Sequence, residues 1–157
     1  MDQMYLYIMS EAMFSLGNKE QAAFWYYIAQ VRTRGYVKND PDQSASPAFR
    51  DSLQDSIGPF INKWVGSDPD AWANLAIRSM RYEKKLSYPP KPSYISDEKS
   101  WESIVDGERT EYEKQFSKLF PQGILKDKET FLVDRKKNGL YNGPWKDRGA
   151  PLKDEWK

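Results

Sequence analysis

The segment AAFWYYIA, residues 22–29, constrains the fold of this 157-residue chain more than any other. Its eight residues are apolar on nearly every face, so a helix through them must be packed on more than one side. It is far shorter than the roughly 20 apolar residues that span a bilayer. We therefore expect a central helix inside a soluble globular domain.

A turn at Gly17 separates this segment from an earlier helical pattern over residues 3–15, in which apolar side chains recur at helical spacing. The small side chains of Ala22 and Ala29 allow two backbones to approach closely, and Tyr26 fills the gap between them. The pattern predicts two helices that pack as an antiparallel pair. The second helix is expected to be the centre of the domain.

The predicted ends of the second helix follow from its flanking residues. Asn18 followed by Gln21 three residues later is typical of a capping box. Gly35 can take the left-handed conformation that closes a helix, which predicts an end near Arg34.

Residues 11–30, EAMFSLGNKEQAAFWYYIAQ, resemble one tetratricopeptide unit, a helical hairpin whose family holds other proteins or peptides. Only one such unit is readable in the chain. Residues 11–34, EAMFSLG…FWYYIAQVRTR, together with the closing segment NGLYNGPW…GAPLKDEW, also resemble small bacterial effector-associated immunity proteins. This second resemblance implies an inhibitor that binds and neutralises a secreted toxin.

The rest of the chain shows helical patterns and no strand-like alternation. Tyr88-Pro-Pro-Lys-Pro-Ser-Tyr94 is the Pro-rich stretch, and we expect an extended strap held down by its two tyrosines. The sequence predicts an all-α, single-domain bundle of five to six helices over residues 1–157, with a tetratricopeptide-like hairpin and an irregular C-terminal tail. Its parts are a first helical half (1–87), the strap (88–96), C-terminal helices (97–138) and the tail (139–157).

Boundaries of the later helices come from Pro, Gly and Asp. Their predicted ranges are a helix from Ser46-Pro47 that stops at Gly58-Pro59, a short turn of helix over 60–65, a helix capped by Asp68 that reaches Leu86, a long helix over 97–120 ended by 121–123, and a helix over 127–138 closed by Gly139.

The composition excludes several kinds of chemistry. The chain has no Cys and no His, so it has no thiol or imidazole catalysis, no disulfide and no zinc site with the usual ligands. It has no Gly-rich phosphate loop, and without His and Cys only weak carboxylate metal sites remain, so we expect no cofactor and no metal. The absence of Cys fits the cytoplasm or, if a leader has been removed, the bacterial periplasm, and the compartment stays open.

Charge is unevenly distributed although the net charge is only +1. Residues 93–113 carry seven acids and two bases, whereas residues 114–157 carry 11 bases and six acids. This bipolar pattern favours a protein partner over nucleic acid, which would need a strongly basic face.

Catalysis would have to come from paired carboxylates, as in glycoside cleavage, which needs two acids about 5–10 Å apart. Glu11, Glu20, Glu102 and Glu108 are the candidates. No pattern separates such a pair from solvated acids in a chain with 23 of them. The expectation is a protein that is not an enzyme.

Basic and aromatic side chains outside the core are the predicted partner-binding residues. Trp25, Trp64, Trp72 and Trp101 lie on helical stripes and are expected in the core, whereas the tail residues Trp145 and Trp156 either bind a partner or pack the tail onto the helices. The candidate binding residues are Arg32, Arg34, Arg135, Lys136, Trp145 and Arg148. They form one surface for an acidic partner only if the last helix packs near the end of the second.

The sequence thus predicts a non-catalytic protein-binding module, specifically an immunity-type inhibitor of a secreted toxin. The alternatives are a tetratricopeptide-like adaptor that binds a peptide, and a carboxylate-dependent glycoside-cleaving enzyme. The expected partner is another protein, with no nucleic acid and no membrane insertion, and the oligomeric state stays open.

Overall fold

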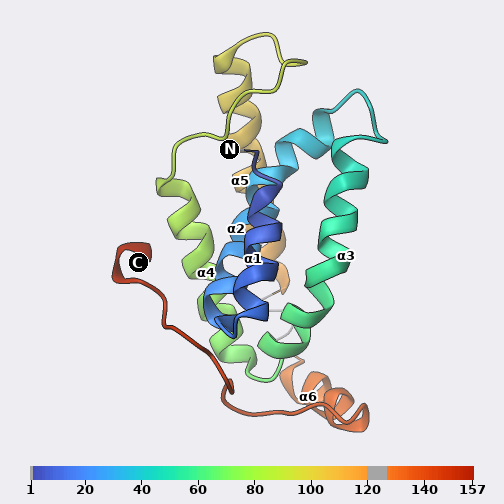
Figure 1. Ribbon diagram of the computed structural model, residues 1–157, viewed down its shortest axis with the longest axis vertical. Helices are drawn as coiled ribbons and strands as arrows, with labels where there is room; N and C mark the ends of the chain where they lie inside the picture. Colours follow the sequence, from blue (N-terminus) through green and yellow to red (C-terminus); the bar gives the residue numbers. More distant parts are fainter. Residues whose placement is uncertain (1, 120–126) are drawn as a thin grey trace.

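The computed structural model describes residues 2–119 and 127–157, which form an all-α bundle and contain no strand (Figure 1). This confirms the predicted fold class. The helices are α1 (Tyr5–Ser15), α2 (Lys19–Asn39), α3 (Ser46–Val65), α4 (Pro69–Lys85), α5 (Glu98–Leu119) and α6 (Lys128–Lys137), followed by the short 3₁₀ helix η2 (Asp154–Trp156).

The central position of α2 is confirmed, because this helix packs against α1, α3, α4 and α5. Ala22, Phe24, Ile28 and Ala29 are fully buried, as expected for a helix that is apolar on nearly every face. Removing apolar surface from water stabilises the folded state by about 25 cal/mol per Å². Because α2 is buried on several sides, it contributes a large share of the hydrophobic stabilisation.

α1 and α2 form the predicted antiparallel pair. Gly17 has a φ of +87°, a left-handed conformation that glycine adopts without steric cost. Tyr26 is 3% exposed, and its ring meets the edge of Tyr7 on α1 at 5.8 Å between centroids. The buried face of α1 is not the one that the helical spacing of its apolar residues predicts. Leu6, Tyr7 and the polar Ser10 are buried, whereas Tyr5, Ile8 and Leu16, which belong to the predicted stripe, are exposed.

The predicted capping box of α2 is wrong, because the C-terminal tail occupies both side chains. Asn18 makes no cap hydrogen bond; its Oδ1 accepts from the backbone N–H of Ala150. Gln21 donates to the carbonyl oxygen of Pro151. Contacts from 130 residues away thus replace the local ones.

The predicted end of α2 at Gly35 is also wrong, since the helix continues to Asn39. Gly35 serves close packing instead: a Cβ at this position would lie 2.9 Å from the ring of Trp101 on α5. Arg32 and Arg34 therefore lie within the helix and not at its end.

The predicted stop at Gly58-Pro59 does not occur, and α3 runs through Pro59 to Val65. A proline inside a helix costs about 3 kcal/mol. Here Ile57, Ile61 and Val65 recur every fourth residue and are at most 3% exposed. Their shared packing face extends across the proline and offsets its cost.

The cap at Asp68 and the strap are as predicted. The Asp68 carboxylate accepts from the N–H of Ala71 at 3.1 Å and starts α4. In the strap, Tyr94 donates to the carbonyl of Tyr36 at 3.0 Å, and Tyr88 donates to Asp106 on α5 at 2.9 Å. We call the end of the bundle that the strap crosses the strap end. The predicted end of the long helix at residues 120–123 lies outside the described residues.

α6 and the tail lie at the opposite end of the bundle, and the tail then runs up beside α4 (Figure 1). Gly139 closes α6 with a φ of +71°, as predicted. The tail is irregular but docked: Trp156 stacks on Phe24 of α2 at 5.4 Å, and Leu152 is buried.

Candidate functional site

Three of the six predicted partner-binding residues are buried, so the expectation that all six lie outside the core is wrong. Arg32 and Arg135 are each 7% exposed and Trp145 is 9% exposed. Of the predicted core tryptophans, Trp101 is fully buried, and the other three are half-buried.

Arg32 belongs to a closed ionic network that we call the Glu83 network. Glu83 of α4 is 1% exposed and binds Arg32 at 3.1 Å and Arg109 of α5 at 2.8 Å. Arg32 also donates to Gln3 and to the carbonyl of Ser87. Burial lowers the pKa of the Arg32 guanidinium, and Glu83 opposes that shift. The network ties α2, α4 and α5 to the segment that precedes α1 and to Ser87, the residue before the strap.

Arg34 and Arg148 are both held by carboxylates. Arg34 donates to Glu108 at 2.9 Å, and Arg148 makes two hydrogen bonds to Glu20 at 2.8 and 3.0 Å. Arg148 is still 53% exposed. Lys136 is exposed on α6.

The six residues form two groups and not one. Arg32 and Arg34 lie toward the strap end, whereas Arg135 and Lys136 lie on α6 at the opposite end (Figure 1). Arg148 lies over the ring of Trp145 at 5.5 Å and joins the second group. The condition for a single surface, that the last helix packs near the end of the second, is therefore not met.

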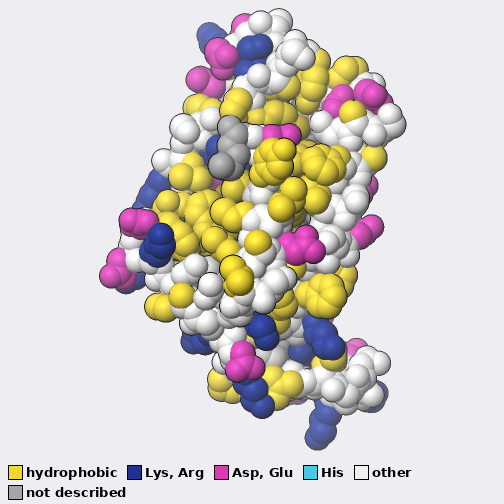
Figure 2. Space-filling view, viewed as in Figure 1, with side chains coloured by type: hydrophobic (Ala, Val, Ile, Leu, Met, Phe, Trp, Pro, Cys, Tyr) yellow, Lys and Arg dark blue, Asp and Glu magenta, His cyan; other side chains and the backbone are white. Residues whose placement is uncertain are grey.

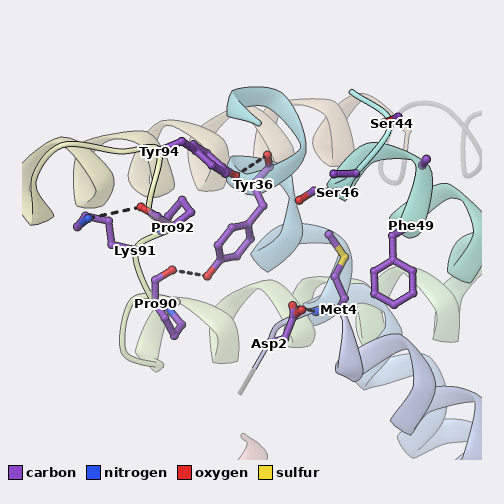
Figure 3. Close-up of a pocket in the computed structure, with 12 residues that line it drawn as sticks. Asp2, Met4, Tyr36, Ser44, Ser46, Phe49, Pro90, Lys91, Pro92 and Tyr94 are labelled. Carbon is purple, nitrogen blue, oxygen red and sulfur yellow. Dashed lines mark hydrogen bonds between the residues drawn. The ribbon is translucent and has the colours of Figure 1, made fainter. Parts of the chain in front are cut away.

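A hollow of about 910 Å³ lies at the strap end, between the ends of α2 and α3 and the strap (Figure 3). Its polar groups are already paired: Tyr36 donates to Pro90, Lys91 donates to Ile95, and Asp2 accepts from the N–H of Met4. A hollow with satisfied side chains offers little to orient a ligand. The full lining comprises Asp2, Met4, Tyr36, Ser44, Ala45, Ser46, Ala48, Phe49, Pro90, Lys91, Pro92 and Tyr94.

The second hollow, of about 250 Å³, lies at the α6 end and differs in chemistry. We call it the basic–aromatic pocket. Figure 2 shows Lys and Arg side chains beside hydrophobic ones at this end of the molecule. Four cations and four aromatic rings contribute to the lining, and no acid does. The lining residues are Phe14, Lys19, Phe60, Lys63, Trp64, Ser67, Arg135, Leu140, Tyr141 and Lys146.

Arg135 fixes the shape of this pocket. Its Nη2 donates to the carbonyls of Lys63 and Tyr141, both at 2.9 Å, and its Nε donates to Asn142 at 3.1 Å. These bonds tie the C-terminal carbonyls of α3 to the segment after α6. All three acceptors are neutral, and burial lowers the pKa of the guanidinium.

Contacts with the C-terminal tail hold the aromatic side chains of the pocket in place. Trp64 stacks on the buried Trp145 at 4.7 Å and donates to the carbonyl of Lys146 at 2.8 Å. The ammonium group of Lys146 lies 3.9 Å from the ring centre of Tyr141. Phe60 and Tyr141 remain 60% and 42% exposed.

None of the four cations has a carboxylate partner within the described part of the chain. Such a cluster raises the local positive potential and attracts anions. The prediction from sequence included Arg135 and missed the rest. Lys19, Lys63 and Lys146 are far from one another in the sequence, so no local pattern indicates that they meet.

Three of the four carboxylates proposed for catalysis have partners, and the fourth, Glu102, is exposed on α5. Glu11 accepts from Ser56, Glu20 binds Arg148, and Glu108 binds Arg34. Glu108 of α5 pairs with Arg34, which lies about 20 Å along α2 from Glu20 at 1.5 Å per residue, so Glu20 and Glu108 do not share one active site. Residues 2–119 and 127–157 contain no group of three or more potential metal ligands.

Comparison with known proteins gives no match to a protein-family model, to a curated protein or to a solved structure. Within the described ranges, no helix is both long and apolar enough to cross a membrane.

Proposed function

We propose that this chain is a non-catalytic protein-binding module that engages an acidic surface of another protein through the basic–aromatic pocket. The observation that carries the proposal is the set of four uncompensated cations around exposed rings. Exposed aromatics supply contact area, and cations steer an acidic partner and fix its orientation.

The specific role we propose is immunity-type inhibition of a secreted toxin, in which the module occludes an acidic region of the toxin. This part rests on the resemblance of residues 11–34 and of the closing segment to effector-associated immunity proteins. The docked tail supports it physically, because Trp145 and Arg148 of that segment brace the pocket.

The peptide-binding adaptor is less well supported. A tetratricopeptide groove needs several stacked hairpins. Here α3, α4 and α5 surround the single hairpin and pack on α2, where a second repeat would have to stack.

The test is binding of the purified protein encoded beside this chain's own gene, measured by calorimetry. Lys63→Glu with Lys146→Glu should weaken binding about 100-fold, because two attractive charges become repulsive. The matched control is Lys99→Glu with Lys114→Glu, the same charge change on α5, which should stay within about threefold of the wild type.

Two outcomes would count against the proposal. Absence of binding by the wild-type chain to any neighbour-encoded secreted protein would overturn the inhibitor role. Equal binding by both double variants would overturn the assignment to the pocket.

A further inference from the structure

The basic–aromatic pocket has the size of a side-chain site. Its volume of about 250 Å³ is below the roughly 300–1,000 Å³ of pockets that hold drug-sized ligands or cofactors. It can hold one or two side chains of a partner. The ligand is therefore better sought among short protein segments than among cofactors.

Arg135 supplies the first chemical requirement of that ligand. A guanidinium has five N–H donors, and the hydrogen bonds to Asn142, Lys63 and Tyr141 use those on Nε and Nη2. Nη1 makes no hydrogen bond within residues 2–119 and 127–157. It lies against Gly66, where an added Cβ would come within 2.6 Å of it. Arg135 is thus a 93% buried cation (7% exposed) with spare donor capacity and no acidic partner.

A buried charge without a counter-charge is costly, whereas an oxyanion that accepts from a guanidinium is bound strongly. Lys63 and Lys146 line the same pocket and add to the attraction. These groups select a carboxylate or another oxyanion.

The rings supply the second requirement. Phe60 and Tyr141 are exposed, and Trp64 lines the same pocket. An anion alone would not use these surfaces, and an apolar group alone would not use the cations. Together they fit an apolar side chain that lies next to an acidic one.

We infer that the basic–aromatic pocket recognises a short acidic protein segment in which an aromatic side chain is flanked by carboxylates. The aromatic side chain packs against Phe60, Trp64 and Tyr141, and a flanking carboxylate meets Arg135. This inference rests on the proposed function, because it specifies what the acidic partner presents to the same site.

The test uses a synthetic peptide with blocked ends that carries Asp-Phe-Glu within a Gly-Ser frame. Binding is followed by calorimetry and by the NMR signal of the Trp64 indole N–H, assigned with Trp64→Phe. We expect saturable binding and a shift of that signal. Asn-Phe-Gln and Asp-Ala-Glu peptides should each bind at least about tenfold more weakly, because each lacks one of the two requirements.

Variants of exposed residues keep the test independent of folding. Lys63→Glu with Lys146→Glu should abolish the shift of the Trp64 signal, whereas Lys99→Glu with Lys114→Glu should leave it unchanged. Raising NaCl from about 50 mM to about 500 mM should weaken binding of the wild type.

The outcomes separate this inference from the proposed function. If the neighbour-encoded protein binds in a pocket-dependent manner but the Asp-Phe-Glu peptide does not bind, the inference is overturned and the function stands. If the peptide binds as expected and no neighbour-encoded protein does, the inference stands and the inhibitor role falls. Tighter binding of inorganic phosphate or of a single-stranded oligonucleotide than of the peptide would also overturn the inference.

Discussion

Arg32 and Arg135 are equally buried, at 7% exposure, yet they lie in opposite electrostatic environments. At the strap end, Arg32 shares Glu83 with Arg109, so two buried cations meet a buried carboxylate. At the α6 end, Arg135 binds only neutral acceptors and is surrounded by further cations. In the first arrangement the charges neutralise one another and stabilise the packing of the helices. The second keeps its positive potential available to a ligand.

The size of a cavity is therefore a poor guide to function in this molecule. The hollow at the strap end is the larger one, but its hydroxyl, ammonium and carboxylate groups already have partners (Figure 3). The smaller basic–aromatic pocket has uncompensated charge and exposed rings. In this molecule, charge of one sign beside exposed rings, rather than volume, distinguishes the basic–aromatic pocket from the larger hollow.

The largest effect is expected at the strap end. Glu83→Gln removes the shared counter-charge and leaves Arg32 buried without an acid, while Arg109 keeps only the exposed Asp106 at 3.3 Å, which should lower the free energy of unfolding by about 3–5 kcal/mol. Urea unfolding measures this value. The control is Glu113→Gln, which breaks an exposed pair with Lys84 and should cost no more than about 1 kcal/mol. Similar small losses for both variants would show that the Glu83 network does not hold this end together.

A smaller loss is expected for Arg135→Met at the α6 end. The substitution keeps much of the apolar stem but removes the donors to Lys63, Tyr141 and Asn142, which should cost about 1–3 kcal/mol in urea unfolding. No carboxylate is left unpaired, so the loss should stay below that of Glu83→Gln. A larger loss than for Glu83→Gln would reverse the comparison and make Arg135 primarily a structural residue.

The smallest effect on stability is expected for Lys63→Gln with Lys146→Gln. Both side chains are exposed and without acidic partners, so the melting temperature should change by less than about 2 °C. Neutralisation also removes repulsion among the cations, which favours the folded state. A fall of 5 °C or more in a thermal melt would mean that these lysines stabilise the α6 end and are not free for a ligand.

The features that were predicted correctly from the sequence depend on residues that are close together in the chain. The turn at Gly17, the cap at Asp68 and the closing Gly139 depend on backbone conformation within a few residues. The central helix depends on a continuous apolar segment. These features together determine the all-α class and most of the helix boundaries.

The errors occur where a distant segment overrides a local signal. Gly35 does not end α2, because Trp101 packs against it, and α3 passes through Pro59, because Ile57, Ile61 and Val65 share a buried face. Asn18 does not cap α2, because the tail occupies its side chain. In each case long-range packing supplies more stabilisation than the local preference costs.

The candidate site likewise combines properties that the sequence determines with properties that depend on contacts between distant segments. The sequence by itself determined that the chain is helical, that it lacks His and Cys chemistry, and that its C-terminal third is basic. Only the tertiary structure decided which of the cations are neutralised, because Glu83 reaches Arg32 and Glu20 reaches Arg148 across 51 and 128 residues of chain. It also brought Lys19, Lys63, Arg135 and Lys146 around one pocket. Charge compensation depends on distance in space, and distance along the sequence does not determine it.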